Sequence, residues 1–322
     1  MFKIRNGVGL VDVGDTHLTH LFDGMAKLHS FKFTPGHDSL LFSAKMIQSN
    51  FYKDSMKAGK IAPYPLLDSR NPSYTKEEKG KSMVAGIENM NINVVRYGDS
   101  TYHCLSDFFD SYEIDPETLN TIKKIRPPTD SKPLFDMIPM SAAAHPAQEP
   151  GTTNLINFYN VVEVLPWKRH TVNVLRIISS TETETIASIP RSKLPYMHSI
   201  GLTEEYAVLV AHPLSVDNMN VMNYNTTMDA FIWEGDQPTD IYVVHLKTGE
   251  VKQIKLNPSL FFMHIANTYQ VGHTIVMDWT TYSSYEMMYL LRLDNMRSSD
   301  PYWPNSLVTH LKRVVIALAS LT

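Results

Sequence analysis

The stretch LPYMHSIGLTEEYAVLV, residues 194–210, combines the features of a buried strand with an imidazole among its apolar side chains. Its second half, residues 206–210, is a run of aromatic and branched apolar residues that is typical of a strand. In the first half, His198 follows a bulky apolar run and precedes Gly201. A single histidine in such a strand is usually a core residue with a hydrogen-bonded ring. The question is whether other histidines occupy similar settings.

Extended segments dominate the rest of the chain. Residues 199–214, 239–256 and 273–282 are rich in β-branched and aromatic residues, and LKTGEV, at 246–251, predicts a hairpin turn. The spacing of Met, Tyr and Leu over 282–298 predicts a helix. Polar, proline-containing sequence predicts loops over the segments 57–81 and 126–133. We expect one large β-rich domain, either a barrel, a sandwich or a propeller.

Composition and charge exclude several classes of protein. The 322 residues are 43% hydrophobic and 19% charged, which is an ordinary balance for a globular chain with a core. The net charge of −4 argues against a nucleic-acid binder, which would carry a basic stripe. Cys104 is the single cysteine, so no internal disulfide forms and a reducing compartment is expected. No leader sequence and no run of 18 apolar residues is visible, so we expect a cytoplasmic protein.

Three histidines share one kind of setting. His145, His198 and His264 each follow small or apolar residues and each leads into sequence with strand character. They are 53 and 66 residues apart, and a four-stranded propeller blade takes roughly 40–50 residues, more with insertions. Equivalent positions on successive blades would bring the three rings to one axis, where neutral imidazoles bind iron, zinc or copper. The alternative is three unrelated core histidines in a chain that holds 13.

Four local sequences resemble the carotenoid cleavage oxygenase family, which includes β-carotene oxygenases and the retinoid isomerohydrolase of the retinal pigment epithelium. RNGVGLVDVGDTHLTHLFDGMAKLHSFKF, at 5–33, is similar to the family's N-terminal signature. The sequences around its first three iron ligands are similar to AHPAQEPGTTNLIN at 144–157, YMHSIGLTEEY at 196–206 and FFMHIANTYQ at 261–270. The four motifs follow one another in the family's order, which makes the resemblance far more specific than any single motif.

The resemblance implies a seven-bladed β-propeller that holds Fe(II) on its axis through four histidines. His145, His198 and His264 match three of these ligands, and Asp107 aligns with a glutamate that orients a histidine in the family. The implied activity is that of a carotenoid dioxygenase. One C=C bond of a carotenoid or apocarotenoid is cleaved by dioxygen into two carbonyl products. Because such substrates are lipids, the resemblance also implies peripheral association with a membrane.

The chain departs from the family pattern in its last part. The family's fourth histidine lies near the C-terminus of a longer chain. Here only His310 follows once His273 is set aside, and its surroundings do not match. We therefore expect a C-terminally truncated, incomplete propeller over residues 1–297 and a divergent tail over 298–322. Two other functions stay open: a relative that binds a carotenoid or retinoid without cleaving it, and a propeller that serves only as an interaction scaffold.

Overall fold

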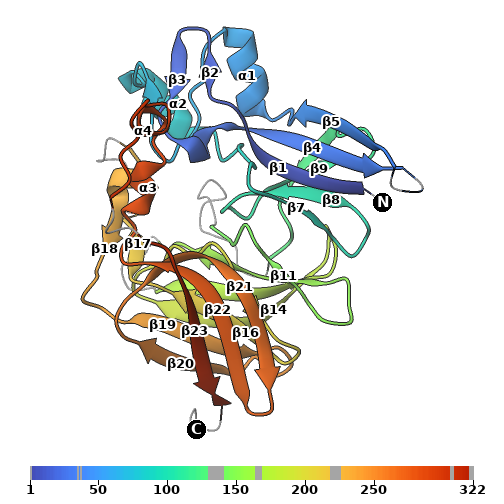
Figure 1. The fold of residues 1–322 in the computed structure, drawn as a ribbon, viewed down its shortest axis with the longest axis vertical. Coiled ribbons are helices and arrows are strands. Elements are labelled where there is room, and N and C mark those ends of the chain that lie inside the picture. The colour runs from blue at the N-terminus through green and yellow to red at the C-terminus, as the bar shows by residue number, and fades with distance from the viewer. Residues whose placement is uncertain are drawn as a thin grey trace.

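The computed structural model is built mainly of antiparallel strands (Figure 1). It describes residues 2–318 except 35, 37, 130–140, 164–168, 218–225 and 305–307. The larger sheets follow one another along the chain, and each is formed by strands that are close in sequence. This arrangement confirms the all-β prediction.

The first large sheet and a small one beside it are formed by the N-terminal residues. The large sheet has the order β1-β4-β5 and the small one the order β2-β3-β6. The bounds are β1 Phe2–Leu10, β2 Asp12–Val13, β3 Thr16–Leu18, β4 Met25–Phe33, β5 Leu40–Met46 and β6 Arg70–Asn71, with the 3-10 helix η1 at Leu21–Asp23. One face of the large sheet packs on the next sheet through the core residues Leu28 and Tyr112.

Two four-stranded sheets form the middle of the chain. Their orders are β10-β9-β8-β7 and β11-β12-β13-β14. The bounds are β7 Asn93–Arg96, β8 Tyr102–Leu105, β9 Ser111–Ile114, β10 Thr121–Ile125, β11 Ala147–Gln148, β12 Leu155–Val161, β13 His170–Ile177 and β14 Thr183–Arg191. Every residue of β12 is buried, as expected of a strand with packed neighbours on both faces.

Three further sheets complete the described part of the chain. Their orders are β15-β16-β19-β20, β17-β18 and β21-β22-β23. The bounds are β15 Gly201–Leu202, β16 Tyr206–Ala211, β17 Leu214–Val216, β18 Phe231–Trp233, β19 Thr239–His245, β20 Val251–Leu256, β21 Phe261–Val271, β22 Thr274–Tyr282 and β23 His310–Ala317. The strand β23, within the expected tail, pairs with β22 along its whole length.

The helices gather on one side of the molecule, away from the C-terminus (Figure 1). Their bounds are α1 Asn50–Ala58, α2 Lys76–Val84, α3 Met287–Leu290 and α4 Leu293–Met296, with a 3-10 turn η3 at Met228–Ala230. No helix among the described residues is both long and apolar enough to span a lipid bilayer.

Local sequence explains most of these elements, and the structure corrects two of the expectations drawn from it. The hairpin at 246–251 is confirmed, because β19 pairs with β20 and Gly249 takes the positive φ of 72° that the turn needs. The helix expected over 282–298 is two separate helices of four residues each. The loop expected over 57–81 contains the strand β6 and residues 76–81 of α2. Of the loop expected over 126–133, residues 130–133 lie outside the described part.

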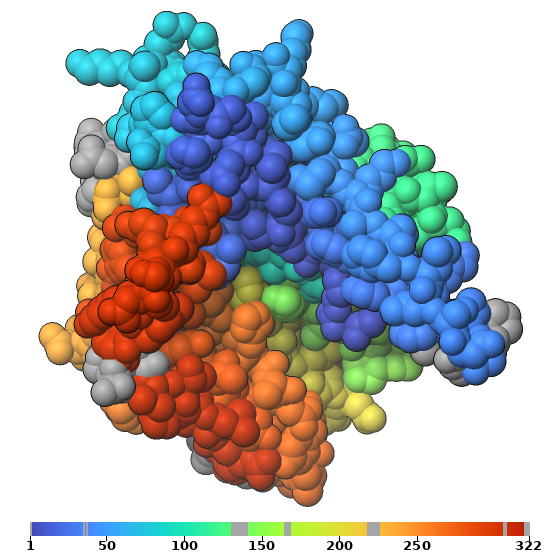
Figure 2. All heavy atoms as spheres, turned by 45° about the horizontal axis from the view of Figure 1, so that its top comes forward, coloured from blue at the N-terminus to red at the C-terminus, as the bar shows by residue number. Residues whose placement is uncertain are grey.

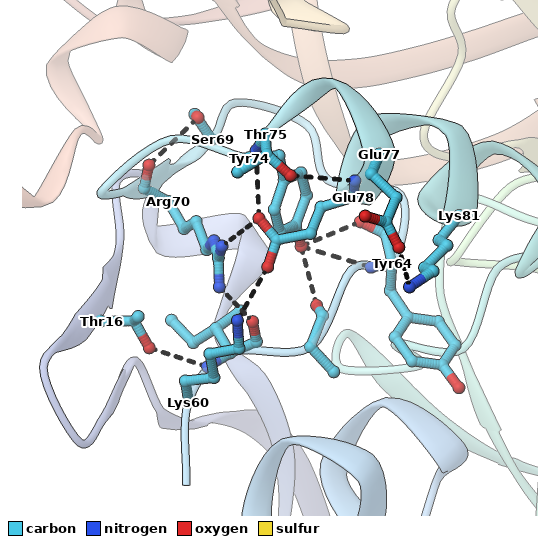
Figure 3. A network of polar contacts seen from close by, with 12 residues as sticks. Thr16, Lys60, Tyr64, Ser69, Arg70, Tyr74, Thr75, Glu77, Glu78 and Lys81 are labelled. Carbon is cyan, nitrogen blue, oxygen red and sulfur yellow. Dashed lines mark hydrogen bonds and ion pairs between the residues drawn. The ribbon is translucent and has the colours of Figure 1, made fainter. Parts of the chain in front are cut away.

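The start of α2 is fixed by a polar network (Figure 3). Thr75 and Glu78 form a capping box, in which each side chain accepts from the other residue's backbone N–H. The Glu78 carboxylate also contacts the Arg70 guanidinium at 2.6 Å and the Lys60 ammonium at 3.0 Å. This network ties α2 to the strand β6 and to the segment that follows α1.

Residues far apart in the sequence close one face of the molecule. Figure 2 shows the red-orange C-terminal segments against the blue N-terminal ones, beside a hollow floored by segments from the middle of the chain. The contact includes ion pairs of Arg292 with Asp68 and of Arg297 with Asp12. The His20 ring adds a hydrogen bond of 2.8 Å from Nε2 to the Met288 carbonyl. The segment 288–297 and the N-terminal segments therefore support one another.

Candidate metal centre

The structure brings His145, His198 and His264 together, as the sequence predicts. The ring centroid of His145 lies 4.7 Å from that of His198 and 5.0 Å from that of His264, and the last two are 5.0 Å apart. One nitrogen from each ring lies within 4.8 Å of the others. Among the described residues, no other group of histidine, cysteine and acidic side chains has this geometry.

Backbone contacts fix the three segments that carry these rings. The His145 N–H donates to the His198 carbonyl at 3.3 Å, and His145 forms a parallel bridge with Ser199. The Ser199 hydroxyl donates to the carbonyl of Met263 at 2.6 Å. Contacts of the histidine backbones, or of the residues next to them, therefore link the three segments to one another.

The position of each histidine at or near a strand sets the direction of its ring. His145 and His198 stand just before the two-residue strands β11 and β15, which begin their sheets. His264 lies within β21, where the pairing with β22 shifts register between Phe262 and Ile265. A bulge of this kind re-aims a side chain without ending the strand.

The Asp107 carboxylate contacts the His198 ring at Nδ1. The Nδ1 atom of His198 lies 2.7 Å from Oδ1 and 3.0 Å from Oδ2 of Asp107. Because an ionised carboxylate only accepts hydrogen bonds, Nδ1 of His198 is the donor in this contact. The Asp107 backbone is held in turn, since its carbonyl accepts from the Ala142 N–H at 3.1 Å. The expected contact between Asp107 and a histidine is therefore present.

The environment keeps His145 neutral. Burial, followed by the neighbouring His198 and His264, lowers the pKa of His145 to about 4. Its Nε2 atom is buried and has no hydrogen-bond partner among the described residues. The Asn93 amide lies 3.4 Å from Nδ1 but is closer to the Ala144 carbonyl, at 3.1 Å. Burial and His198 also lower the pKa of His264. Neutral imidazoles with a free lone pair are the form that binds metal.

These observations agree with a metal site. A buried nitrogen without a partner is costly unless something binds it, and three convergent imidazoles suit a divalent transition metal. His198 is buried and carries the carboxylate support common among metal-bound histidines. His264 is exposed, so one side of the cluster faces solvent. The three histidines can therefore hold a metal ion.

Two side chains beside the cluster were missed in the sequence. The Tyr196 hydroxyl donates to Asp107 Oδ2 at 2.8 Å, and burial followed by the Asp107 charge raises its pKa well above the usual value. Tyr196 lies two residues from His198, but only the position of Asp107 in space shows that both side chains reach the same carboxylate. His212 is buried against Phe261 and Phe262, and nothing in its local sequence marked it. His310 lies exposed on β23 and is not part of the cluster.

An apolar, aromatic-rich cluster adjoins the centre. Phe261 and Met263, the neighbours of His264 along β21, are buried in it. Tyr196 packs against the same cluster, with its ring 5.6 Å from that of Phe231. The side chains next to the histidines are thus mainly apolar and buried.

Known proteins agree with this architecture. Residues 3–322 match the family model described as retinal pigment epithelial membrane protein. Curated relatives include a carotenoid isomerooxygenase of Galleria mellonella, 25% identical over 93% of this chain and 60% of its own length. A β,β-carotene 15,15′-dioxygenase of Gallus gallus is 26% identical over 90% of this chain and 59% of its own length. The chain thus spans about three fifths of the length of these relatives.

Solved structures share the fold. A variant of the apocarotenoid oxygenase of Synechocystis superposes with a TM-score of 0.76 at 21% identity, covering 99% of this chain and 64% of that one. A cobalt-substituted form of the Synechocystis protein gives a TM-score of 0.76 at 23% identity, covering 100% of this chain and 65% of that one. The fold is therefore the propeller fold that the motifs imply, present here in part. The chain belongs to the retinal pigment epithelial membrane protein family, the family of the carotenoid oxygenases.

Proposed function

We propose that the chain carries the iron centre of a carotenoid dioxygenase, with His145, His198 and His264 as ligands of Fe(II). The observation that supports this most strongly is the convergence of the three imidazoles, one of which is hydrogen-bonded to Asp107. Ferrous iron, when bound, would supply the activation of dioxygen. In the overall reaction one C=C bond breaks and each carbon gains one oxygen atom, so both atoms of dioxygen enter the two carbonyl products.

The side chains have separate tasks in this proposal. The imidazoles are uncharged ligands and leave the ion its positive charge. Asp107 holds the Nδ1 proton of His198, so that Nε2 is free to coordinate. The buried aromatic cluster with Tyr196, Phe231 and Phe261 would keep the surroundings of the ion apolar, as a polyene substrate requires. Dioxygen and a carotenoid or apocarotenoid are the proposed partners, and peripheral membrane association is proposed because such substrates are lipids.

A second candidate is binding of a carotenoid or retinoid without cleavage. It is favoured by the number of ligands, because three histidines converge among the described residues, whereas the resemblance implies four.

The two candidates differ in their products. The chain is loaded with Fe(II) without oxygen, mixed with β-carotene or an apocarotenoid, and then exposed to ¹⁸O-labelled dioxygen. Cleavage predicts two carbonyl fragments, each with label before exchange, and their loss in His198→Ala. The matched control His310→Ala should retain them. Bound polyene with no fragments would replace the dioxygenase proposal with the binding one.

A further inference from the structure

Asp107 receives two side-chain donors from one strand-like segment. Tyr196 donates its hydroxyl to Oδ2 at 2.8 Å, and His198 approaches Oδ1 with Nδ1 at 2.7 Å. Residues two apart in an extended backbone project to the same side, so this pairing follows from the local conformation. The carboxylate therefore bridges a tyrosine and a histidine that the sequence already places side by side.

The segment and the carboxylate are both anchored. The Tyr196 N–H donates to the Leu214 carbonyl at 2.8 Å, and the Asn160 amide donates to the Pro195 carbonyl at 3.3 Å. Asp107 follows β8, and its backbone carbonyl accepts a hydrogen bond from the Ala142 N–H. With the backbones fixed, the remaining freedom is rotation of the Asp107 carboxylate about its own side-chain bonds.

We propose that Tyr196 is a positioning residue that acts on the metal centre through Asp107. His198 Nδ1 contacts both carboxylate oxygens at nearly equal distances of 2.7 and 3.0 Å. By holding Oδ2, Tyr196 fixes the rotation of the carboxylate and leaves Oδ1 as the acceptor for His198, which sets the direction of the His198 ring. This proposal rests on the proposed function, because the residue that Tyr196 positions is a proposed ligand.

The first test is made without metal. In the chain labelled with ¹⁵N-histidine, NMR distinguishes the two neutral tautomers, and the His198 signals are assigned by their loss in His198→Ala. We expect His198 to carry its proton on Nδ1 in both the unsubstituted chain and Tyr196→Phe, because Asp107 accepts that proton in either. In Tyr196→Phe the Nδ1 signal of His198 should shift and broaden, because the carboxylate is free to rotate. A His198 Nδ1 signal of unchanged position and width in Tyr196→Phe would overturn the proposal.

The second test measures Co²⁺ affinity by absorbance titration. Removal of a side chain that holds a metal ligand by a hydrogen bond typically weakens metal affinity 10- to 100-fold, and we expect a loss of about tenfold for Tyr196→Phe. The matched control is Tyr64→Phe, because the Tyr64 hydroxyl makes the same kind of bond to Asp54, at 2.7 Å, on α1. It should bind Co²⁺ as the unsubstituted chain does.

A double-substitution cycle shows whether the effect passes through Asp107. In the Asp107→Ala background, Tyr196→Phe should weaken Co²⁺ binding no further. An additional tenfold loss there would overturn the positioning role. If the unsubstituted chain binds no Co²⁺, the proposed metal function fails, while the NMR signal of His198 Nδ1 still decides the role of Tyr196.

Discussion

At the scale of single residues, the F-D-G sequence at 22–24 serves the fold. The buried Asp23 carboxylate accepts hydrogen bonds from the backbone N–H groups of Leu67 and Asp68. Gly24 leaves no room for a side chain, since an added Cβ would lie 2.2 Å from a methyl carbon of Val8 and 3.0 Å from one of Val11. These residues join the start of β4 to the segment before β6.

The substitution Gly24→Ala should therefore destabilise the chain by about 1–3 kcal/mol, the usual cost of overpacking a core. The control is Gly80→Ala, because Gly80 lies within α2 with nothing within 4 Å of an added Cβ. That change should stabilise the fold by about 1 kcal/mol. Urea unfolding of both variants measures the difference, and equal effects of the two would contradict this reading of Gly24.

The sequence predicted the candidate ligands but not all of the side chains that hold them in place. His145, His198 and His264 could be selected because each stands in a similar local setting, and Asp107 because of its place in a family motif. Tyr196 was missed, since its role depends on where the connection from β8 to β9 lies in space. The orphaned Nε2 of His145 is likewise a property of packing.

At the scale of elements, the ionic network at the start of α2 makes stability depend on pH. Burial of Glu78 opposes its ionisation, but the Thr75 N–H and the cations of Lys60 and Arg70 outweigh it and lower the pKa to about 2. The folded pKa lies below the ordinary value of 4.5. The unfolded chain therefore binds the proton more tightly, and this stabilisation is lost as pH falls from about 4.5 towards 2.

The substitution Glu78→Gln should lower the free energy of unfolding at pH 7 by about 1–3 kcal/mol, the worth of hydrogen bonds to a charged group. It should also flatten the decline of stability between pH 4.5 and pH 3. Glu77→Gln is the control, because Glu77 pairs only with the exposed Lys81. Urea unfolding across this pH range measures how the free energy of unfolding depends on pH in each variant. Equal dependence in Glu78→Gln and in the unsubstituted chain would refute the role of the Glu78 carboxylate.

Local patterns predicted strands better than helices. Alternating and apolar runs identified the strands around 206–211, 239–256 and 274–282 because burial in a sheet repeats every two residues. The pattern over 282–298 was read as one helix, although the chain changes direction at Leu291 and Arg292 to reach the N-terminal segments. The capping box at Thr75 was visible in the sequence and would have located α2.

At the scale of the whole molecule, contacts between distant segments hold residues 292–297 against the N-terminal part of the chain. Arg292 contacts Asp68 at 3.0 Å across 224 residues of sequence. The Asp68 side chain is 5% exposed, whereas Arg297 and Asp12, which form the second pair, are 49% and 43% exposed. A buried charge that loses its partner costs far more than an exposed one.

The substitution Arg292→Gln should therefore destabilise the chain by about 3 kcal/mol. Arg297→Gln, the matched change at the exposed pair, should cost less than about 1 kcal/mol. Chemical denaturation separates the two. A loss of similar size for both would show that burial of Asp68 does not govern this contact. No local pattern predicted the pair, because neither residue lies near the other in sequence.

The arrangement of the sheets came from the family motifs rather than from strand patterns, which left a barrel, a sandwich and a propeller open. The division into a propeller over 1–297 and a divergent tail over 298–322 stays a prediction. The pairing of β23 with β22 shows that part of this tail adds a strand to the last sheet.

The central claim is that three histidines from successive sheets form one iron site. The most direct measurement is the Fe(II) content of the chain after anaerobic loading and removal of free iron. We predict close to one iron per chain, lost in His198→Ala and retained in His310→Ala. Iron at the same level in His198→Ala, or none in the unsubstituted chain, would contradict the claim.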